Sequence, residues 1–516
     1  MTLGRTYGVG LVGLDGRMVE VEADIGQSLP SFVLLGLPDA SLNEAKDRVR
    51  SAAKNTGLPL SRRKITVNLM PADVHKRGSG FDLAIVMAAL AAAGDVRCSG
   101  RRVFIAELGL DGRLRPVRGI LPAVMAAVEA GYPEITVAEA NADEASLVPG
   151  AQVNGFGSLA EVAAFLGADP RQLVFPPPAA EGESGKSADD ATAVAAPTRD
   201  MSDIAGQSEA RFAVEVAAAG AHHLLMTGPP GAGKTMLAER LPGLLPNLSD
   251  AHAMEVTAIH SLVSGGRTCS QLLRRPPFES PHHTASSAAI IGGGSGIARP
   301  GAASRAHRGV LFLDEAPEYD RRVLDALRQP LESGKVDLHR AAGTASYPAR
   351  FQLVLAANPC PCGLASGKGI DCTCTPQQRR RYFSRLSGPL LDRVDLQLPV
   401  QRVSLRELAG DGAAEQSADI AQRVAQARTV QQQRLMSWGY ETNAEVAGNL
   451  LRGPLRPALR STASLDRAME RQTLTARGYD RVLRVAWSIA DLSGHSTPDA
   501  DYVGQALGFR QQGEAA

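Results

Sequence analysis

The chain has 516 residues, and this length predicts two to four domains rather than a single core. Lys and Arg total 55 and Asp and Glu total 54, so the net charge of +1 excludes a bulk electrostatic attraction to nucleic acid. The longest apolar run, Leu83–Gly94, is shorter than the ~20 residues that a membrane-spanning helix needs, which argues against that class of protein.

The first third of the chain, residues 1–175, alternates short strands with helices. The dipeptides expected in hairpin turns are Asp15-Gly16 and Asp111-Gly112. The apolar segments expected to form buried helices are 81–93 and 121–130. The N-terminal segment lacks the basic-then-apolar pattern of a secretory signal, so we expect a cytoplasmic location. In that compartment the six cysteines favour thiols or a metal site over disulfides.

A segment rich in Pro, Ala, Ser and acidic residues, 176–200, predicts a flexible tether. After it, apolar strands alternate with helical or glycine-rich segments, which is typical of a parallel sheet with crossover helices. The strands are expected at 222–228, 309–315 and 351–358. From about residue 402 the pattern predicts helices only. The fold class is therefore multidomain α/β.

A phosphate-binding loop is predicted by the sequence GPPGAGKT, which follows a strand and precedes a helix. Its glycines allow backbone N–H groups to approach phosphates, and the helix N-terminus favours negative charge there. Lys234 is expected to reach the β- and γ-phosphates, and the Thr235 hydroxyl to bind Mg²⁺. The nucleotide-binding residues expected here are Gly228, Pro229, Pro230, Gly231, Ala232, Gly233, Lys234, Thr235 and Met236.

Two carboxylates follow the next apolar strand, in the sequence VLFLDE. Asp314 is expected beside Mg²⁺, and Glu315 is expected to polarise the attacking water. An acidic helix start after a strand is the alternative. Asn358, at the end of the third strand, could hydrogen-bond the γ-phosphate or the water, although Asn at a strand end is also an ordinary turn former.

These motifs, in this order, resemble the AAA+ ATPases and, more closely, the magnesium-chelatase-like YifB/ComM family. The resemblance covers nearly the whole chain. The segments that carry it are 34–52, 203–238, 279–294, 309–334, 386–396 and 474–492. It implies an AAA+ core over residues 201–401 that is similar to the magnesium chelatase subunit ChlI, and a C-terminal helical lid over 402–516.

The resemblance also implies a ring, usually a hexamer, with ATP and Mg²⁺ held between subunits. Such sites take a cation from the neighbouring subunit, and Arg393 is the expected arginine finger. Arg477 is the expected lid arginine, contacting phosphate of its own subunit. A surface or helix-capping role is the alternative for each arginine. Ile204, in the segment 203–207, is expected to lie along the adenine.

Residues 1–175 resemble the proteolytic domain of Lon, an S5 domain 2-like α+β fold that carries a Ser–Lys pair. Gly80 stands roughly at the position of the serine and Leu121 at that of the lysine. A leucine cannot accept a proton, and a serine nucleophile needs an adjacent base. Ser79 lies next to Gly80, but a structural role in its GSG turn is favoured. We therefore expect a non-catalytic module for substrate binding or ring assembly.

Four cysteines lie within fifteen residues, as two C-x-C pairs. Four thiolates can close a tetrahedral Zn²⁺ site, and the glycines between the pairs allow the loop to fold back. Unligated thiols and a redox pair are the alternatives. The expected zinc ligands are Cys360, Cys362, Cys372 and Cys374. Cys98 and Cys269 are isolated and are expected to be small apolar residues.

Basic and aromatic residues follow the cysteines: Arg379, Arg380, Arg381, Tyr382, Phe383 and Arg385. This pattern suits single-stranded nucleic acid, through phosphate contacts and base stacking. A solvated helix face and a contact between ring subunits suit it equally. Two further segments are expected to line the pore of a ring and to contact DNA there. They are the glycine-rich insert 290–301 and the hairpin 333–351, with Lys335, His339 and Arg340. His282 and His283 could bind a metal, but loop residues are the more ordinary interpretation.

Three functions fit these features. The first is an ATP-driven ring motor on single-stranded or branched DNA; the resemblance implies branch migration during natural transformation. The second is a chelatase motor subunit that drives metal insertion or remodels a protein partner. Such motors work with a D-x-S-x-S partner, and the nearest match here, Asp491 to His495, lacks the last serine. The third, an ATP-dependent protease, is disfavoured by Gly80 and Leu121.

Overall fold

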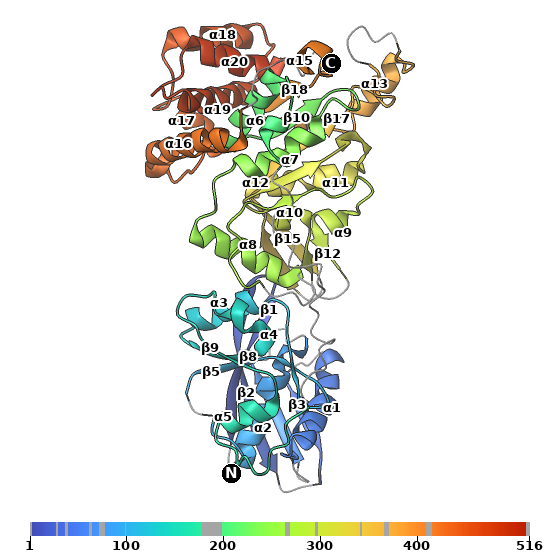
Figure 1. Ribbon diagram of the computed structural model, residues 1–516, viewed down its shortest axis with the longest axis vertical. Helices are drawn as coiled ribbons and strands as arrows, with labels where there is room; N and C mark the ends of the chain where they lie inside the picture. Colours follow the sequence, from blue (N-terminus) through green and yellow to red (C-terminus); the bar gives the residue numbers. More distant parts are fainter. Residues whose placement is uncertain are drawn as a thin grey trace.

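The structure is a computed structural model, with an N-terminal lobe at one end and the C-terminal helices at the other (Figure 1). The residues that it describes are 3–26, 29–36, 40–60, 64–71, 78–98, 100–177, 199–263, 269–294, 298–340, 343–365, 371–408 and 415–511. The tether expected at 176–200 falls almost wholly on residues 178–198, outside these ranges.

The N-terminal lobe is built on a seven-stranded mixed sheet with the order β3-β4-β2-β1-β5-β8-β9. Its strands are β1 (Gly4–Val12), β2 (Asp15–Gly26), β3 (Phe32–Leu35), β4 (Lys64–Met70), β5 (Arg102–Ile105), β8 (Glu134–Ala138) and β9 (Gln152–Phe156). The short hairpin comprises β6 (Glu107–Leu108) and β7 (Leu114–Arg115). The helices are α1 (Ala40–Asn55), α2 (Asp82–Ala93), α3 (Ile120–Glu129), α4 (Glu139–Ala145) and α5 (Leu159–Phe165).

The two buried helices expected in this lobe are confirmed as α2 and α3. Asp111-Gly112 lies in the turn between β6 and β7, as expected. The turn expected at Asp15-Gly16 is wrong by two residues, because Val12 pairs with Asp15 and the turn is Gly13-Leu14. Gly13 takes the positive φ of 67° that this turn requires.

The second sheet has five strands, all parallel, in the order β11-β14-β17-β10-β18. Its strands are β10 (Leu224–Thr227), β11 (Phe278–Glu279), β14 (Val310–Leu313), β17 (Gln352–Ala357) and β18 (Leu396–Pro399). The residues of β14 and β17 are all buried, and a sheet covered on both faces explains these continuous apolar runs. The three strands expected from sequence are thus confirmed in one parallel sheet.

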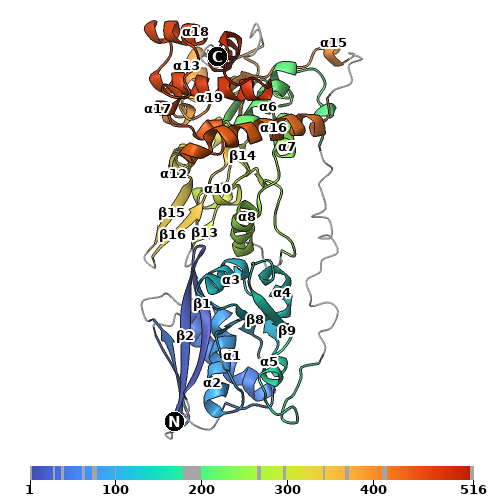
Figure 2. The same ribbon diagram turned by 90° about the vertical axis from the view of Figure 1, so that its left-hand side faces the viewer.

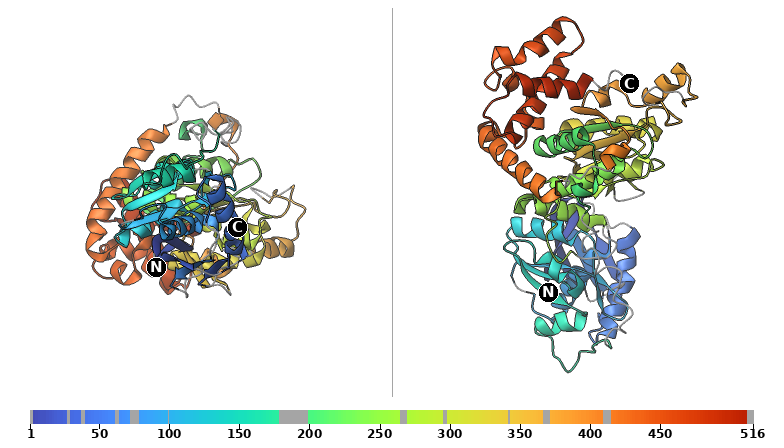
Figure 3. Two further views of the ribbon diagram at one scale, coloured as in Figure 1. Left: turned by 90° about the horizontal axis from the view of Figure 1, so that it is seen from below. Right: turned by 45° about the horizontal axis from the view of Figure 1, so that its top comes forward.

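Helices cover the second sheet and continue to the C-terminus (Figure 3). Those before β18 are α6 (Ser208–Gly220), α7 (Lys234–Leu244), α8 (Asp250–Val263), α9 (Ser287–Ile290), α10 (Ala302–Arg305), α11 (Arg321–Ala326), α12 (Arg328–Ser333), α13 (Pro376–Phe383) and α14 (Gly388–Leu391). Those after it are α15 (Leu405–Leu408), α16 (Ser417–Leu435), α17 (Gly448–Leu451), α18 (Leu459–Glu470), α19 (Ala476–Leu492) and α20 (Ala500–Gln511). Among the described residues after 402 every element is helical, as expected.

Two hairpins project from the second sheet toward the N-terminal lobe (Figure 2). They are β12 (Gly292–Gly293) with β13 (Arg299–Pro300), and β15 (Lys335–Arg340) with β16 (Gly343–Pro348). The second hairpin is the one expected over 333–351, although residues 341–342 lie outside the described ranges. It reaches the β1–β2 turn, where a Cβ on Gly13 would lie 3.2 Å from the Ser346 carbonyl oxygen. The hairpin therefore links the two sheets.

Within the described ranges, no helix is both long and apolar enough to cross a bilayer. The resemblance of residues 1–175 to the Lon domain stays a prediction, as do the domain boundaries.

Candidate functional site

The phosphate-binding loop connects β10 to α7 at the carboxyl edge of the parallel sheet. Gly231 and Gly233 have φ angles of 77° and 87°, which favour glycine. A Cβ on Gly228 would lie 2.1 Å from the Val400 carbonyl oxygen, so no larger residue fits there. Local backbone geometry and close packing therefore explain why the loop is rich in glycine.

Lys234 lies inside this loop, only 8% exposed. Its ammonium group donates hydrogen bonds to the carbonyl oxygens of Gly228 at 2.6 Å and Pro229 at 3.1 Å, and to Asn358 Oδ1 at 3.2 Å. Burial lowers the pKa of Lys234, while Asp314 and Glu315 oppose that shift. The structure thus brings together the expected lysine and the expected asparagine, which are 124 residues apart.

The two expected Mg²⁺ ligands also meet. The Thr235 hydroxyl donates a 2.8 Å hydrogen bond to Asp314 Oδ2. Hydroxyl and carboxylate oxygens are the hard donors that Mg²⁺ prefers, usually together with waters and phosphate oxygens. This pair therefore fits the ion that the AAA+ resemblance implies.

Glu315 follows Asp314 in a left-handed backbone conformation, with φ of 51°. Such a φ is uncommon outside glycine and turns the chain sharply at the strand end. Glu315 Oε2 lies 3.3 Å from His283 Nδ1. Sequence reasoning missed this partner, because it treated His283 as a loop residue or metal ligand and had no signal that the loop reaches β14.

The segment 203–207 lies against the loop. Ile204 is 5% exposed, and Gln207 Nε2 donates hydrogen bonds to the carbonyl oxygens of Ala232 at 2.6 Å and Gln401 at 3.1 Å. Met236 is exposed at the start of α7. Gln207 is a further residue that sequence reasoning did not single out.

Arg393 lies at the opposite edge of the sheet, just before β18, which runs parallel to β10. Its guanidinium group pairs with Glu332 and donates a 2.5 Å hydrogen bond to the Pro389 carbonyl oxygen. Arg477, at the start of α19, lies beside Arg393, 3.8 Å from Asp392 Oδ2. The start of the lid helix lies at the edge away from Lys234, and the expectation that Arg477 contacts phosphate of its own subunit stays a prediction.

A buried polar network joins this edge to the lid. Asp395 accepts a 2.5 Å hydrogen bond from Arg481 and lies 3.2 Å from His222 Nδ1, whose Nε2 lies 2.7 Å from Ser488 Oγ. Burial alone would raise the pKa of Asp395, but Arg481 and His222 reverse the shift and hold it well below its usual range. Arg481 also donates a 2.9 Å hydrogen bond to the Arg393 carbonyl oxygen. The network therefore fixes the backbone of the expected finger to α19.

His223, which follows His222 in the chain, is expected to make the free energy of unfolding depend on pH. Its Nδ1 accepts a 3.0 Å hydrogen bond from the Leu353 N–H, so protonation there breaks the bond. Burial lowers the pKa of His223 to about 4, although Asp395 opposes the shift. A histidine whose pKa is lowered on folding stabilises the protein above its unfolded pKa. This stability is lost as the pH falls from about 6.5 to 4, by at most about 3 kcal/mol.

His223→Asn isolates this contribution, since the amide oxygen can accept the same hydrogen bond without titrating. We expect the difference in free energy of unfolding between wild type and variant to shrink as the pH falls across this window, measured by urea titration. Parallel pH profiles for the two proteins would contradict the prediction.

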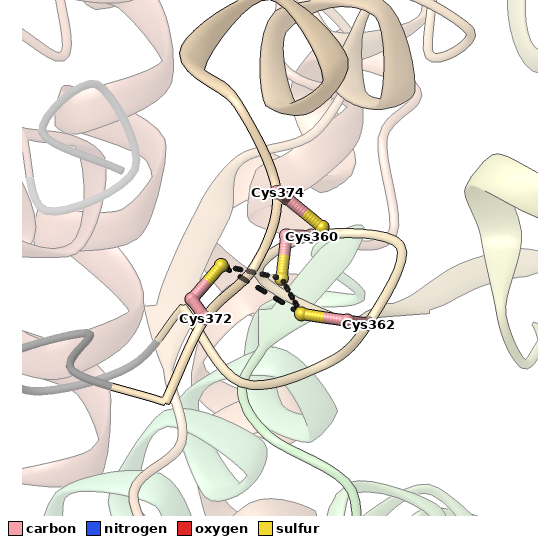
Figure 4. A group of neighbouring side chains, drawn as sticks. All are labelled: Cys360, Cys362, Cys372 and Cys374. Atoms are coloured by element: carbon pink, nitrogen blue, oxygen red, sulfur yellow. Dashed lines mark hydrogen bonds between the residues drawn. The ribbon is translucent and has the colours of Figure 1, made fainter.

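The four clustered cysteines converge at the turn after β17 (Figure 4). Cys360 Sγ lies 3.2 Å from that of Cys362 and 3.7 Å from that of Cys372, and the last two are 3.6 Å apart. All four Sγ atoms, including that of Cys374, lie within 4.8 Å of one another. Among the described residues, this is the one group of three or more His, Cys, Asp or Glu side chains found close enough to hold a metal ion.

The basic and aromatic residues 379–383 lie in α13, which Thr375 caps, and Arg385 follows the end of this helix. Arg380 and Arg381 are exposed, whereas Tyr382 is only 5% exposed. Burial raises the pKa of Tyr382 to about 12, although the Asn358 backbone N–H, which donates a hydrogen bond to the phenol oxygen, opposes this shift. The part of the expectation that used Tyr382 for base stacking is therefore wrong, because the ring is packed inside.

The other expected contact residues are spread over the surface. Lys335 is exposed but pairs with Asp337 at 3.2 Å, and His339 lies 2.9 Å from Thr344 Oγ1. The side chain of Arg340 and residues 295–297 of the insert 290–301 lie outside the described part of the chain. His282 Nδ1 lies 2.8 Å from Thr284 Oγ1.

In the N-terminal lobe, Ser79 and Gly80 lie just before α2, and Leu121 lies at the start of α3. The Ser79 hydroxyl donates a hydrogen bond to the Glu107 carboxylate. Leu121 is fully buried in α3. Gly80 has room around it, since a Cβ there would lie 3.7 Å from Val117 at the closest.

Comparison with known proteins assigns the chain to a family. Three family models match successive parts: subunit ChlI of Mg-chelatase over residues 21–141, magnesium chelatase subunit ChlI over 200–408, and the ChlI C-terminal region over 414–510. The competence protein ComM of Haemophilus influenzae is 40% identical over 99% of this chain and 98% of its own. The chain belongs to the magnesium-chelatase-like YifB/ComM family.

Other relatives agree with this assignment to the YifB/ComM family. The uncharacterized protein YifB of Escherichia coli is 40% identical over 99% of this chain and 97% of its own. An uncharacterized protein of Mycobacterium tuberculosis is 50% identical over 99% of both chains. Magnesium-chelatase-like proteins are AAA+ ATPases, and this supports ATPase activity at the site described above.

Proposed function

We propose that the chain is an ATP-hydrolysing ring motor that acts on DNA. The observation that carries the hydrolytic part is the convergence of five side chains at the carboxyl edge of the sheet, supplied by three separate strand ends. They are Lys234, Thr235, Asp314, Glu315 and Asn358.

Each of these residues has a role in hydrolysis. The loop backbone and Lys234 bind the phosphates. Asn358 orients the Lys234 ammonium group and the γ-phosphate. Thr235 and Asp314 hold Mg²⁺, which neutralises charge on the phosphate oxygens. Glu315 takes the proton of the attacking water, and its contact with His283 holds the carboxylate to one side until substrate is present.

Arg393 acts on the nucleotide of a neighbouring copy in this proposal, and Arg477 is the lid arginine for the nucleotide of its own subunit. Arg393 lies at the amino edge of the sheet, away from its own phosphate-binding loop. A head-to-tail ring, with six subunits as the expected number, places that edge against the next subunit's carboxyl edge. The cytoplasm is the proposed compartment.

DNA is the proposed substrate of the motor. The relative named competence protein ComM supports a competence-related role, and branch migration is the activity that the family resemblance implies. The exposed Arg380 and Arg381 supply local positive charge on a chain without a net excess. Residues 1–175 act as a non-catalytic module for substrate binding or assembly, joined by 176–200 to the core (201–401) and lid (402–516).

A chelatase-type motor that remodels a protein partner is the second candidate. It is favoured by the three ChlI models, which together match most of the chain. It predicts an ATPase that responds to a protein partner and ignores every DNA offered.

The steady-state ATPase rate with and without single-stranded and branched DNA tests the proposal. We expect DNA to raise the rate. We expect the double variant Arg380→Ala, Arg381→Ala to lower the ratio of stimulated to basal rate, and to flatten its dependence on salt concentration, because two phosphate contacts are lost. Arg456→Ala with Arg460→Ala removes two exposed arginines from the lid region and is the matched control. An active ATPase that is indifferent to DNA would favour the chelatase-type motor.

A further inference from the structure

We propose that the four cysteines hold one Zn²⁺ ion, and that this metal-closed turn positions Pro230 and Asn358 in the nucleotide site. The first half concerns a metal site and stands apart from the proposed function. The second half, a coupling between metal and ATP turnover, rests on the proposed ATPase.

The sulfur geometry fits one tetrahedral ion. Zn–S bonds of about 2.3 Å place the sulfurs of a tetrahedral site about 3.8 Å apart. The Sγ distances of 3.2, 3.6 and 3.7 Å are close to this value. A disulfide needs about 2.05 Å, so the sulfurs of Cys360 and Cys362, 3.2 Å apart, are not joined as a disulfide. The Ala365 N–H also donates to Cys360 Sγ at 3.4 Å, as backbone groups do around thiolate ligands.

The turn that carries the first two cysteines touches the phosphate-binding loop. Gly363 follows Cys362 with φ of 77°, and a Cβ on Gly363 would lie 2.7 Å from two carbons of the Pro230 ring. The Pro230 ring therefore packs directly on the backbone of the turn. Closing the turn around a metal fixes the surface against which the loop rests.

The same turn is anchored to the expected sensor residue at both ends. Cys360 comes two residues after Asn358, whose side chain accepts a hydrogen bond from Lys234. Cys374 comes immediately before the cap of α13, and Tyr382 of that helix hydrogen-bonds the Asn358 backbone. One ion thus ties together the two chain segments that hold Asn358.

The zinc content of the protein tests the metal site independently of ATPase activity. We expect the purified full-length protein, kept reduced and supplied with zinc, to contain one zinc per chain by elemental analysis. Replacing zinc by Co²⁺ should produce the visible absorption of tetrahedral thiolate coordination. Cys362→Ser with Cys372→Ser should abolish both signals. Cys98→Ser with Cys269→Ser, which alters the two isolated thiols, is the matched control and should retain them.

Gly363→Ala tests the coupling while retaining all four thiols. The added methyl group meets Pro230, so we expect ATP turnover or nucleotide affinity to fall about tenfold at unchanged zinc content. Gly494→Ala is the matched control, because Gly494 has a nearly equal φ of 73° and open space around its Cβ position. It should impose the same backbone strain without the loss of activity.

The outcomes separate the two halves. Absence of zinc from the reduced, zinc-supplied protein, or zinc that survives loss of Cys362 and Cys372, overturns the metal site. Equal turnover and nucleotide affinity in the Gly363 and Gly494 variants overturn the coupling. An intact metal signal in a wild-type protein that hydrolyses no ATP overturns the proposed function and leaves the metal site standing.

Discussion

Replacement of Glu315 by glutamine is expected to lower ATP turnover by about 10³-fold while nucleotide still binds. Glu315 is the proposed base for the attacking water, and glutamine keeps its size but accepts no proton at neutral pH. Lys234, Thr235 and Asp314 keep their mutual contacts in this variant, since none of them uses the Glu315 side chain as a partner. The expected phenotype is therefore tight nucleotide binding with slow hydrolysis.

Two measurements check this expectation: steady-state phosphate release, and equilibrium binding of a fluorescent ATP analogue. Asp325→Asn is the matched control, because it also removes one carboxylate from the segment after β14. Asp325 lies on α11, where it is 3.7 Å from Arg321 in an exposed pair that contributes little. Turnover in Glu315→Gln within a few-fold of wild type would show that another group activates the water.

Replacement of Arg393 by alanine is expected to lower turnover by about 10³-fold, the lower end of what arginine fingers contribute. Because Arg393 lies at the edge away from its own Lys234, we expect the loss to be repaired by a neighbour. Mixing Arg393→Ala with Lys234→Ala subunits should therefore restore part of the activity. In such rings the intact loop of one variant faces the intact arginine of the other.

Phosphate release from the mixture, measured over a range of mixing ratios, checks this prediction. Each variant alone should be inactive, and activity should peak at intermediate ratios. Arg467→Ala, which alters an exposed arginine on α18, is the control and should match wild type. Mixtures that never exceed the sum of the two inactive variants would contradict a role for Arg393 across the subunit interface.

Much of the nucleotide-binding edge was predictable because its signals are local. A glycine-rich loop between a strand and a helix, and carboxylates after an apolar strand, each depend on a few consecutive residues. Parallel strands place their carboxyl ends at one edge, so the meeting of Lys234, Asp314 and Asn358 follows once the strands are recognised. The contact of Glu315 with His283 was not predictable, because a loop far from β14 in the sequence supplies the histidine.

One expectation failed because it depended on a long-range contact. Tyr382 reads as part of a basic and aromatic nucleic-acid segment, yet the ring packs inside and reaches Asn358, a long-range contact that no local pattern encodes. The position of α19 was equally beyond local patterns, since the network around Asp395 and Arg481 joins the start of this helix to the Arg393 backbone.

The sequence by itself determined the order of the elements, the phosphate-binding loop, the acidic strand end and the number of clustered thiols. These depend on periodicity, residue type and spacing, which are properties of short segments. Only the tertiary structure decided which edge of the sheet each arginine occupies, how close the four sulfurs lie, and that Gly363 supports Pro230. Residue type and spacing within one segment do not encode such distances, because the packing of the whole fold determines them.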